Sequence, residues 1–259
     1  MNDIEKLAAL ILHSKNAVFF GGAGVSTESG IPDFRSEAGL YTAKSVYAHS
    51  PEELLSHSLF LREPELFFRY YKENLITHSA KPNAAHVALA KLEERGYISA
   101  VITQNIDGLH QAAGSQTVCE LHGSNWKQYC MKCGARYTLD YILDEHNCKD
   151  GIIPTCRECG GVVRPDVVLY EEGLDDDVIN TSLNAIKNTD LLIAGGTSLV
   201  VYPAAGLLQY FRGDNLVLIN KSETQYDSKA SLVIHKSIGK VLKEAADIIE
   251  AAPLSKKQS

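Results

Sequence analysis

The stretch Ala17-Val-Phe-Phe-Gly-Gly-Ala-Gly24 decides the fold class of this chain. Its four apolar residues, 17–20, have the length of a buried strand, and the glycines that follow end the run. A glycine turn after such a strand lets the backbone approach a pyrophosphate at the N-terminus of the next helix. The stretch therefore predicts the first strand and turn of a nucleotide-binding α/β domain.

Outward from this stretch, helical and strand patterns alternate. Periodic apolar residues and capping signals predict helices over 3–13, 64–77, 83–95, 175–188, 203–211 and 238–251 and a helix start at Pro51, and short apolar runs predict strands over 98–103, 167–170, 191–194 and 216–220. This alternation implies a parallel sheet covered on both faces, so we predict a Rossmann-like, doubly wound α/β fold. The uncharged run 191–211 is long enough to span a bilayer, but Gly195, Gly196 and Pro203 divide it into strand, loop and helix.

The composition is that of an ordinary globular protein. The chain has 259 residues, of which 45% are hydrophobic and 22% charged, and its net charge is −7. These values exclude a disordered or fibrous chain, and the missing basic surface argues against nucleic acid as a partner. The first residues lack the layout of a signal peptide. We therefore expect a cytoplasmic protein that binds neither nucleic acid nor membrane, and a monomer.

Two CxxC pairs point to a metal. Cys130 and Cys133 form the first pair and Cys156 and Cys159 the second, and a glycine follows each. Two such turns place four thiolates around one ion, which is typical of a closed, structural zinc site. Two disulfides or a redox dithiol are the alternatives, and a reducing cytoplasm disfavours both. Cys119 and Cys148 stand outside the pairs and are interpreted as buried or incidental thiols.

The cysteine pairs also suggest how the chain is divided. Residues 125–163 hold five of the six cysteines and show little helical periodicity. We expect them to form a small zinc-binding module inserted into a discontinuous, Rossmann-like nucleotide-binding domain, 1–124 and 164–252. The polar residues 253–259 are expected to be a flexible tail.

The glycine turn departs from the fingerprint of dehydrogenases. The pattern Gly22-x-Gly24-x-x ends at Thr27 instead of a third glycine, and no acidic residue follows at the position that reads a ribose hydroxyl. Hydride transfer is therefore disfavoured, whereas dinucleotide binding remains open.

The continuation, Gly24-Val-Ser-Thr-Glu-Ser-Gly-Ile-Pro-Asp-Phe-Arg35, resembles the signature of the sirtuin family. Further blocks agree with this family in order: Thr103-Gln-Asn-Ile-Asp-Gly-Leu-His110, Leu121-His-Gly123, Gly196-Thr-Ser-Leu199 with Pro203-Ala-Ala, and Leu218-Ile-Asn220. The CxxC pairs lie where the family has its zinc module. Together the blocks cover about residues 5 to 250.

The resemblance implies an NAD-dependent protein-lysine deacylase of the bacterial type, which consumes NAD as a cosubstrate and carries one structural Zn²⁺. It assigns the general base to His122 and the nicotinamide and its ribose to Gln104, Asn105, Ile106 and Asp107, of which Asn105 and Asp107 are expected to act in catalysis. The remaining expected cofactor contacts are Ala23, Thr27, Phe34, Arg35, Thr197, Ser198, Asn220 and Ile238.

The residue types suit this chemistry. As cationic nicotinamide leaves, the amide oxygen of an acyl-lysine can attack the ribose, and a neutral histidine can then accept a hydroxyl proton. The products would be lysine, nicotinamide and O-acyl-ADP-ribose. Taken singly, His122 could be structural, Asp107 a helix cap and Asn105 a turn residue, while His86 is interpreted as helix packing.

The expected substrate is an acetyl-lysine protein or peptide. Residues 167–172 resemble the family strand that pairs with the peptide, so Val168 and Tyr170 are expected contacts. Glu171 stands where the family has glycine, and its charge is expected to favour basic neighbours of the target lysine. Family members that remove acidic acyl groups carry a Tyr-x-x-Arg pair. Here the helix reads Tyr71-Lys-Glu-Asn74, so uncharged acyl groups are expected.

Four other functions fit parts of the pattern. A mono-ADP-ribosyltransferase would use the same NAD site, and a related enzyme could remove other or longer acyl groups. A non-enzymatic NAD sensor would not need His122, Asn105 and Asp107 together. A zinc-ribbon nucleic-acid binder would need the basic patch that is missing.

Overall fold

Strand β1, Ala17–Gly21, lies in the middle of a six-stranded parallel sheet in the computed structural model, which describes residues 1–32, 44–77 and 79–252. From one edge to the other the strands are β3 (Val118–Glu120), β2 (Ile98–Thr103), β1, β9 (Leu191–Gly195), β10 (Asn215–Ile219) and β11 (Leu232–Ile234). In register, Phe20 pairs with Ile102 of β2 and Ala194 of β9. The order of connection reverses at β1, which confirms the doubly wound fold and puts the switch point between β1 and β9.

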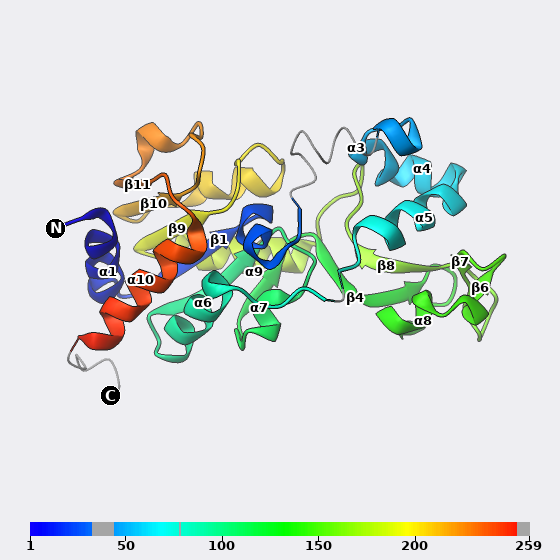
Figure 1. Ribbon diagram of the computed structural model, residues 1–259, viewed down its shortest axis with the longest axis horizontal. Helices are drawn as coiled ribbons and strands as arrows, with labels where there is room; N and C mark the ends of the chain where they lie inside the picture. The colour runs from blue at the N-terminus through cyan, green and yellow to red at the C-terminus, as the bar shows by residue number, and fades with distance from the viewer. Residues whose placement is uncertain (33–43, 78, 253–259) are drawn as a thin grey trace.

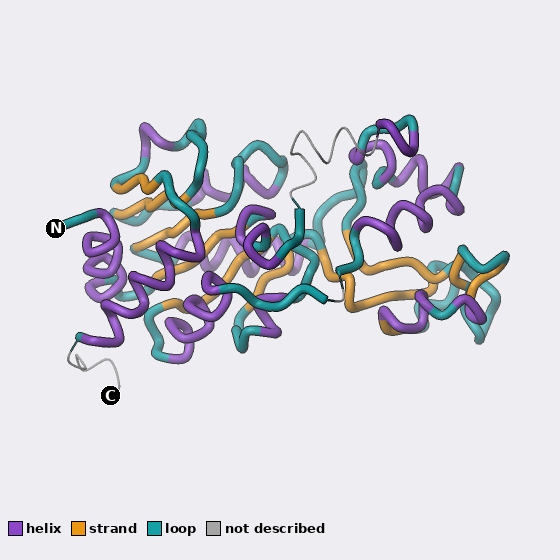
Figure 2. Tube along the Cα trace, viewed as in Figure 1, coloured by secondary structure: helices purple, strands orange, loops and turns teal. Residues whose placement is uncertain are grey.

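Helices cover both faces of this sheet (Figures 1 and 2). Phe19 packs into a core with α1 (Asp3–His13), α6 (Ala84–Glu94) and α10 (Ile238–Ala251). Its neighbour Phe20 points to the other core, with α9 (Asp176–Lys187) and the 3₁₀-helix η4 (Ala204–Tyr210). Side chains alternate across a strand, so one continuous apolar run supplies two cores.

Several elements follow the sequence prediction closely. The bounds of α1, β2 and α10 are those predicted, and Asn2 and Ser50 each form a capping box, at α1 and at α3 (Pro51–Leu54). The segment after the glycine turn differs. It forms two 3₁₀ turns, η1 (Ala23–Val25) and η2 (Thr27–Ser29), because the amide of Gly24 bonds the carbonyl of Gly196 at 2.8 Å and draws the turn onto the neighbouring strand end.

A second lobe contains the cysteine pairs. Strands β4 (Gly123–Cys130), β5 (Arg136–Thr138) and β8 (Val163–Val167) form an antiparallel sheet beside α8 (Leu139–Leu143) and the small pair β6 (Cys148–Lys149) and β7 (Ile153–Pro154). In Figure 1 this lobe lies beside the parallel sheet, joined to it by β4 and β8. The remaining short elements are α7 (Leu109–Ala112) and the 3₁₀ turns η3 (Glu145–Asn147) and η5 (Asp227–Lys229).

The core of the second lobe also includes three helices from an earlier part of the chain. These are α3, α4 (His57–Arg62) and α5 (Pro64–Asn74). Phe67 and Tyr71 of α5 share a cluster of buried residues with Tyr137, Ile142 and Val163. The hydrophobic core therefore groups residues 54–75 with the cysteine module, whereas the sequence division placed them with the sheet. The aromatic face of α5 provides the reason, since it has to be buried against a second apolar surface.

The sequence predictions for residues 167–170 and 191–211 have different outcomes. The strand predicted over 167–170 is found at Val163–Val167, and beyond it Tyr170 makes only an isolated bridge to Ser56. The uncharged run 191–211 is divided into β9, a loop and η4, as predicted. Among the described residues, no helix has the length and apolar character needed to cross a membrane. The predicted tail 253–259 lies outside the described residues.

Candidate active site and metal centre

A pocket opens between the two lobes at the carboxyl ends of β1 and β2. Eight of the residues predicted for the site line it: Ala23, Gln104, Asn105, Ile106, Asp107, His122, Val168 and Tyr170. They come from the glycine turn, the loop after β2, the loop before β4 and the segment after β8. A crevice at the carboxyl edge of the strands, next to the switch point, is where ligands bind in open α/β sheets.

Ser26 holds the two polar side chains of the loop after β2 together. Its hydroxyl donates to Asp107 Oδ2 at 2.7 Å and accepts from Asn105 Nδ2 at 3.0 Å. Ser26 is 1% exposed and also lines the pocket. It was not among the predicted site residues, although it lies in the signature that carried the resemblance. Its partners are 79 and 81 residues away, so no local pattern could have identified them.

His86 lies next to the Ser26 hydroxyl that joins Asn105 and Asp107. Its Nδ1 accepts from the amide of Asn83 at 3.2 Å, which places the proton of the neutral ring on Nε2, 3.5 Å from Ser26 Oγ. Burial lowers the pKa of His86, while the Asp107 carboxylate opposes that shift. His86 is 0% exposed, as the packing interpretation expected, and its ring also bears on Ser26.

The orientation of His122 is set by a backbone carbonyl. Its Nδ1 lies 2.8 Å from the carbonyl oxygen of Gln104, which can only accept. The neutral ring therefore carries its proton on Nδ1 and has its lone pair on Nε2, the form in which a histidine can act as a base.

The predicted phosphate and adenosine positions form a second network beside the pocket. The amide of Thr197 donates to Asn220 Oδ1 at 3.0 Å, and Asn220 Nδ2 returns a bond to the carbonyl of Thr197 at 2.8 Å. Gln104 Nε2 donates to Thr197 Oγ1 at 3.0 Å, which joins this network to the pocket.

Not every predicted cofactor residue lines the pocket. Thr27 bonds the carbonyl of Gly24, Ser198 is exposed, and Ile238 is buried in the core at the start of α10. Phe34 and Arg35 lie outside the described residues. Residues that line the pocket without having been predicted include Leu75, Thr77 and Asn125.

The expected peptide segment borders the same pocket. The amide of Val168 donates to the carbonyl of His122 at 3.0 Å, so the segment is attached to the residue predicted as the base. Tyr71 is 0% exposed, and its hydroxyl donates to Asn125 at 2.7 Å. Asn74 bonds the carbonyl of Tyr70. Tyr71 is thus part of the second core and Asn74 bonds within α5, so neither provides a cationic clamp in the pocket.

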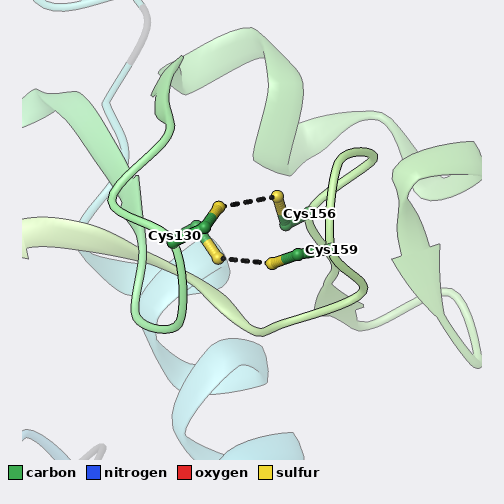
Figure 3. Close-up of side chains that lie close together, drawn as sticks. Cys130, Cys156 and Cys159 are labelled. Carbon is green, nitrogen blue, oxygen red and sulfur yellow. Dashed lines mark hydrogen bonds between the residues drawn. The ribbon is translucent and has the colours of Figure 1, made fainter.

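The four cysteines of the CxxC pairs converge. Their sulfur atoms all lie within 4.8 Å of one another, with 3.5 Å between Cys130 and Cys159 and 3.6 Å between Cys133 and Cys156 (Figure 3). A zinc tetrahedron with bonds of 2.3 Å has edges of about 3.8 Å, whereas a disulfide needs about 2.0 Å. The arrangement fits a structural zinc with no open position, and all six cysteines are free thiols.

The surroundings of Cys156 favour its thiolate form. The hydroxyl of Tyr137 lies 3.0 Å from Cys156 Sγ. Burial raises the pKa of Cys156, but the hydrogen bonds from Tyr137 and from nearby backbone amides outweigh it and bring the pKa to about 6. Of the two other cysteines, Cys119 is buried and Cys148 half-buried, with Lys72 Nζ at 3.4 Å from its sulfur.

Comparisons with known proteins agree on one family. A sequence model described as "Sir2 family" matches residues 22–203. Curated proteins named "NAD-dependent protein deacetylase" from Clostridium acetobutylicum and Clostridium perfringens are 57% and 60% identical over 242 and 245 residues, covering 93% and 94% of this chain and 97% and 98% of theirs. Two solved structures, titled "Sir2-p53 peptide-NAD+" and "Sir2 bound to acetylated peptide", superpose with TM-scores of 0.86 and 0.85 at 37% and 36% identity, over 97% of this chain and all of theirs. The chain therefore belongs to the Sir2 family, the sirtuins.

Proposed function

We propose that this protein is an NAD-dependent protein-lysine deacetylase that produces nicotinamide and O-acetyl-ADP-ribose. The observation that carries the proposal is the orientation of His122, which faces the same pocket as Asn105 and Asp107 with its basic nitrogen defined by the bond from Nδ1 to Gln104. The names of the Clostridium relatives support it.

In this proposal each polar residue has a distinct task. His122 accepts a ribose hydroxyl proton at Nε2, so that the hydroxyl oxygen can attack the acyl carbon. Asn105 and Asp107 hold the nicotinamide end of NAD, and the Ser26 hydroxyl fixes both in place before NAD binds. Because Nδ1 of His122 is engaged by a carbonyl, the ring does not need to reorient when the proton arrives.

The other NAD contacts are proposed from the family positions. Ala23, Thr27, Phe34 and Arg35 belong to the cofactor loop and Ile106 to the nicotinamide side. Thr197, Ser198, Asn220 and Ile238 belong to the adenosine and phosphate side. The hydrogen bond from Gln104 to Thr197 supports coupling between the two sides. Val168 and Tyr170 are proposed to pair with the peptide, and His122, Asn105 and Asp107 to be the catalytic group.

The proposed substrates are proteins or peptides that carry acetyl-lysine. Acidic acyl groups are disfavoured because Tyr71 and Asn74 provide no guanidinium for a carboxylate. We further propose a cytoplasmic protein that does not bind nucleic acid, on the grounds of the free thiols around the zinc site and the net charge of −7. The expectations of a monomer and of no membrane binding stay predictions.

The test is turnover of NAD with an acetyl-lysine peptide, followed by the release of nicotinamide and the mass of the peptide. We expect the mass of one acetyl group to be lost in step with nicotinamide release. Gain of ADP-ribose on the peptide would instead identify a mono-ADP-ribosyltransferase, and no NAD consumption would contradict both activities. A succinyl-lysine peptide should react far more slowly than the acetyl-lysine peptide.

The general base is tested by His122→Ala. We expect kcat to fall by about 10²- to 10⁴-fold, the usual contribution of a positioned acid–base residue, with zinc content and secondary structure unchanged. Replacement of His13, an exposed histidine on α1, by alanine is the matched control and should retain full turnover. Undiminished turnover by His122→Ala would refute the assignment.

A further inference from the structure

The segment from Val168 to Glu172 is held by a short stretch of the second lobe. The amide of Tyr170 donates to the carbonyl of Leu55, and the amide of His57 donates to the carbonyl of Tyr170, both at 3.0 Å. These bonds make a single parallel bridge between Tyr170 and Ser56. A bridge of one residue pair is weak alone, so the side chains next to it decide how firmly the two stretches are joined.

Glu171 adds the first of these side-chain links. Its Oε2 accepts from the amide of Ser58 at 2.8 Å and from the Ser58 hydroxyl at 2.6 Å. Ser58 lies in the first turn of α4, where amides lack partners within the helix, and the Ser56 hydroxyl satisfies the next one, of Leu59. The hydrogen bonds from Ser58 lower the pKa of Glu171, so the carboxylate is charged at neutral pH.

The backbone of Glu171 indicates that this link has a cost. Its φ is +77°, in the left-handed region that favours glycine. A side chain in this region is retained where its contacts offset the strain, and among the described residues the hydrogen bonds of the Glu171 carboxylate are those with Ser58.

Glu172 provides a parallel link to the same stretch. Its carboxylate receives two bonds from the buried Arg164, at 2.6 and 3.0 Å, and one from the amide of Leu169 at 2.8 Å. His57 Nδ1 lies 2.7 Å from the same group. Adjacent glutamates thus attach the segment to His57 and Ser58, the first two residues of α4.

We propose that Glu171 is a positioning residue for the acyl-peptide substrate, whose carboxylate fastens the segment 168–172 to α4 through Ser58. This inference rests on the proposed function, since the segment is the one expected to pair with the peptide. It is an alternative to the expectation that Glu171 presents its charge to basic neighbours of the target lysine, since the carboxylate bonds Ser58. The experiment below distinguishes the two. The effect reaches the active site through Val168, whose amide bonds the carbonyl of His122.

Three variants separate positioning from charge. Glu171→Gln retains an oxygen that can accept from Ser58 but loses the charge. Glu171→Gly relieves the positive φ but removes the link, and Ser58→Ala removes one donor while leaving Glu171 charged. The readouts are KM for an acetyl-peptide, KM for NAD and kcat, with peptides that carry either lysine or glutamate beside the target.

If Glu171 positions the segment, Glu171→Gly and Ser58→Ala raise the peptide KM, by about tenfold for the glycine variant, the scale of losing hydrogen bonds to a charged group. KM for NAD should change by less than about twofold in all variants. The peptide KM of Glu171→Gln should stay close to that of the wild type, because the glutamine oxygen can still accept from Ser58. The ratio between the lysine- and glutamate-flanked peptides should be the same in all variants. Glu65→Gln, which alters an exposed carboxylate of α5, is the matched control.

Two results would overturn the inference. One is an unchanged peptide KM in both Glu171→Gly and Ser58→Ala. The other is that Glu171→Gln and Glu171→Gly lose the preference for lysine-flanked peptides equally, while Ser58→Ala keeps it. That result would show that the peptide is recognised by the charge of Glu171. Failure of the proposed function is distinguishable, because the wild type would then turn over no acetyl-peptide. Binding of a fluorescent acetyl-peptide to the same variants would in that case decide the inference.

Discussion

His110 illustrates how a buried residue beneath the site affects the whole protein. It is 1% exposed, its ring lies between Phe19 and His86, and neither ring nitrogen has a hydrogen-bond partner among the described residues. Burial, with a smaller contribution from His86, lowers the pKa of His110 to about 3. The ring is therefore neutral in the folded protein at every pH at which the protein is expected to work.

This lowered pKa predicts the direction of a pH dependence. The unfolded chain binds a proton at His110 below about pH 6.5, whereas the folded protein does not until about pH 3. Stability is thus complete above pH 6.5 and is lost as the pH falls, at up to about 1.4 kcal/mol per pH unit for this one group. Urea unfolding at pH 7.5 and 5.5 measures it, and His110→Phe should reduce the difference. An equal difference in wild type and variant would contradict the prediction.

At the same scale, the sequence identified the types of the site residues but not all of their partners. The resemblance predicted Asn105, Asp107 and His122, and the structure brings them to one pocket. The hydroxyl of Ser26 that joins the first two is a contact between chain positions about 80 residues apart. Such a contact depends on how β1 and β2 lie side by side, which no local pattern specifies.

At the scale of elements, the backbone of the glycine turn packs directly against the backbone that follows β9. Gly196 has a φ of +61°, and a Cβ at this position would lie 2.5 Å from the amide nitrogen of Val25. A Cβ on Gly24 would in turn lie 2.8 Å from the Cα of Gly196. The close approach of the two turns therefore requires glycine on both sides.

We expect Gly196→Ala to destabilise the fold by about 1–3 kcal/mol, from overpacking and from the left-handed backbone. Because the turn belongs to the proposed NAD site, the affinity for NAD should fall as well. Urea unfolding and calorimetric titration with NAD measure the two effects. Gly173→Ala, at a position with open space around it, is the control and should change neither. A Gly196→Ala protein as stable as wild type would show that the turns can separate without cost.

Local sequence signals predicted these elements well where capping and periodicity act within one segment. Helix α1 begins after Asn2, which bonds Glu5 in a capping box, and its apolar face is spaced for one core. The prediction was less accurate where tertiary contacts compete. The strand expected over 167–170 ends at Val167, because Tyr170 turns to pair with Ser56 instead of extending β8.

At the scale of the whole molecule, the metal site and the second core are one unit. Cys130 and Cys156 belong to the same buried cluster as Phe67 and Tyr71, which come from a separate part of the chain. The core of the parallel sheet is made of other residues. Loss of the metal is therefore expected to affect α3 to α5 together with the cysteine module, and to leave the sheet folded.

Removal of the metal tests this division. The protein should contain one zinc per chain, and a strong chelator should expose residues 51–75 and 125–163 to proteolysis while most of the circular dichroism signal of the sheet lobe persists. Cys156→Ser should have the same effect, and Cys119→Ser, which alters a buried cysteine outside the cluster, should retain the zinc. Elemental analysis that finds no zinc in the purified wild type would refute the metal site.

The sequence by itself determined the alternation of strands and helices, the glycine turn and the thiolate ligands of a metal, because each depends on residues close together in the chain. Only the tertiary structure decided that Ser26 joins Asn105 to Asp107, that α3 to α5 pack with the cysteine module, and that Glu171 bonds Ser58. The physical reason is the same in each case. These contacts join residues about 55 to 115 positions apart, and burial of apolar faces, which is non-directional, brings them together.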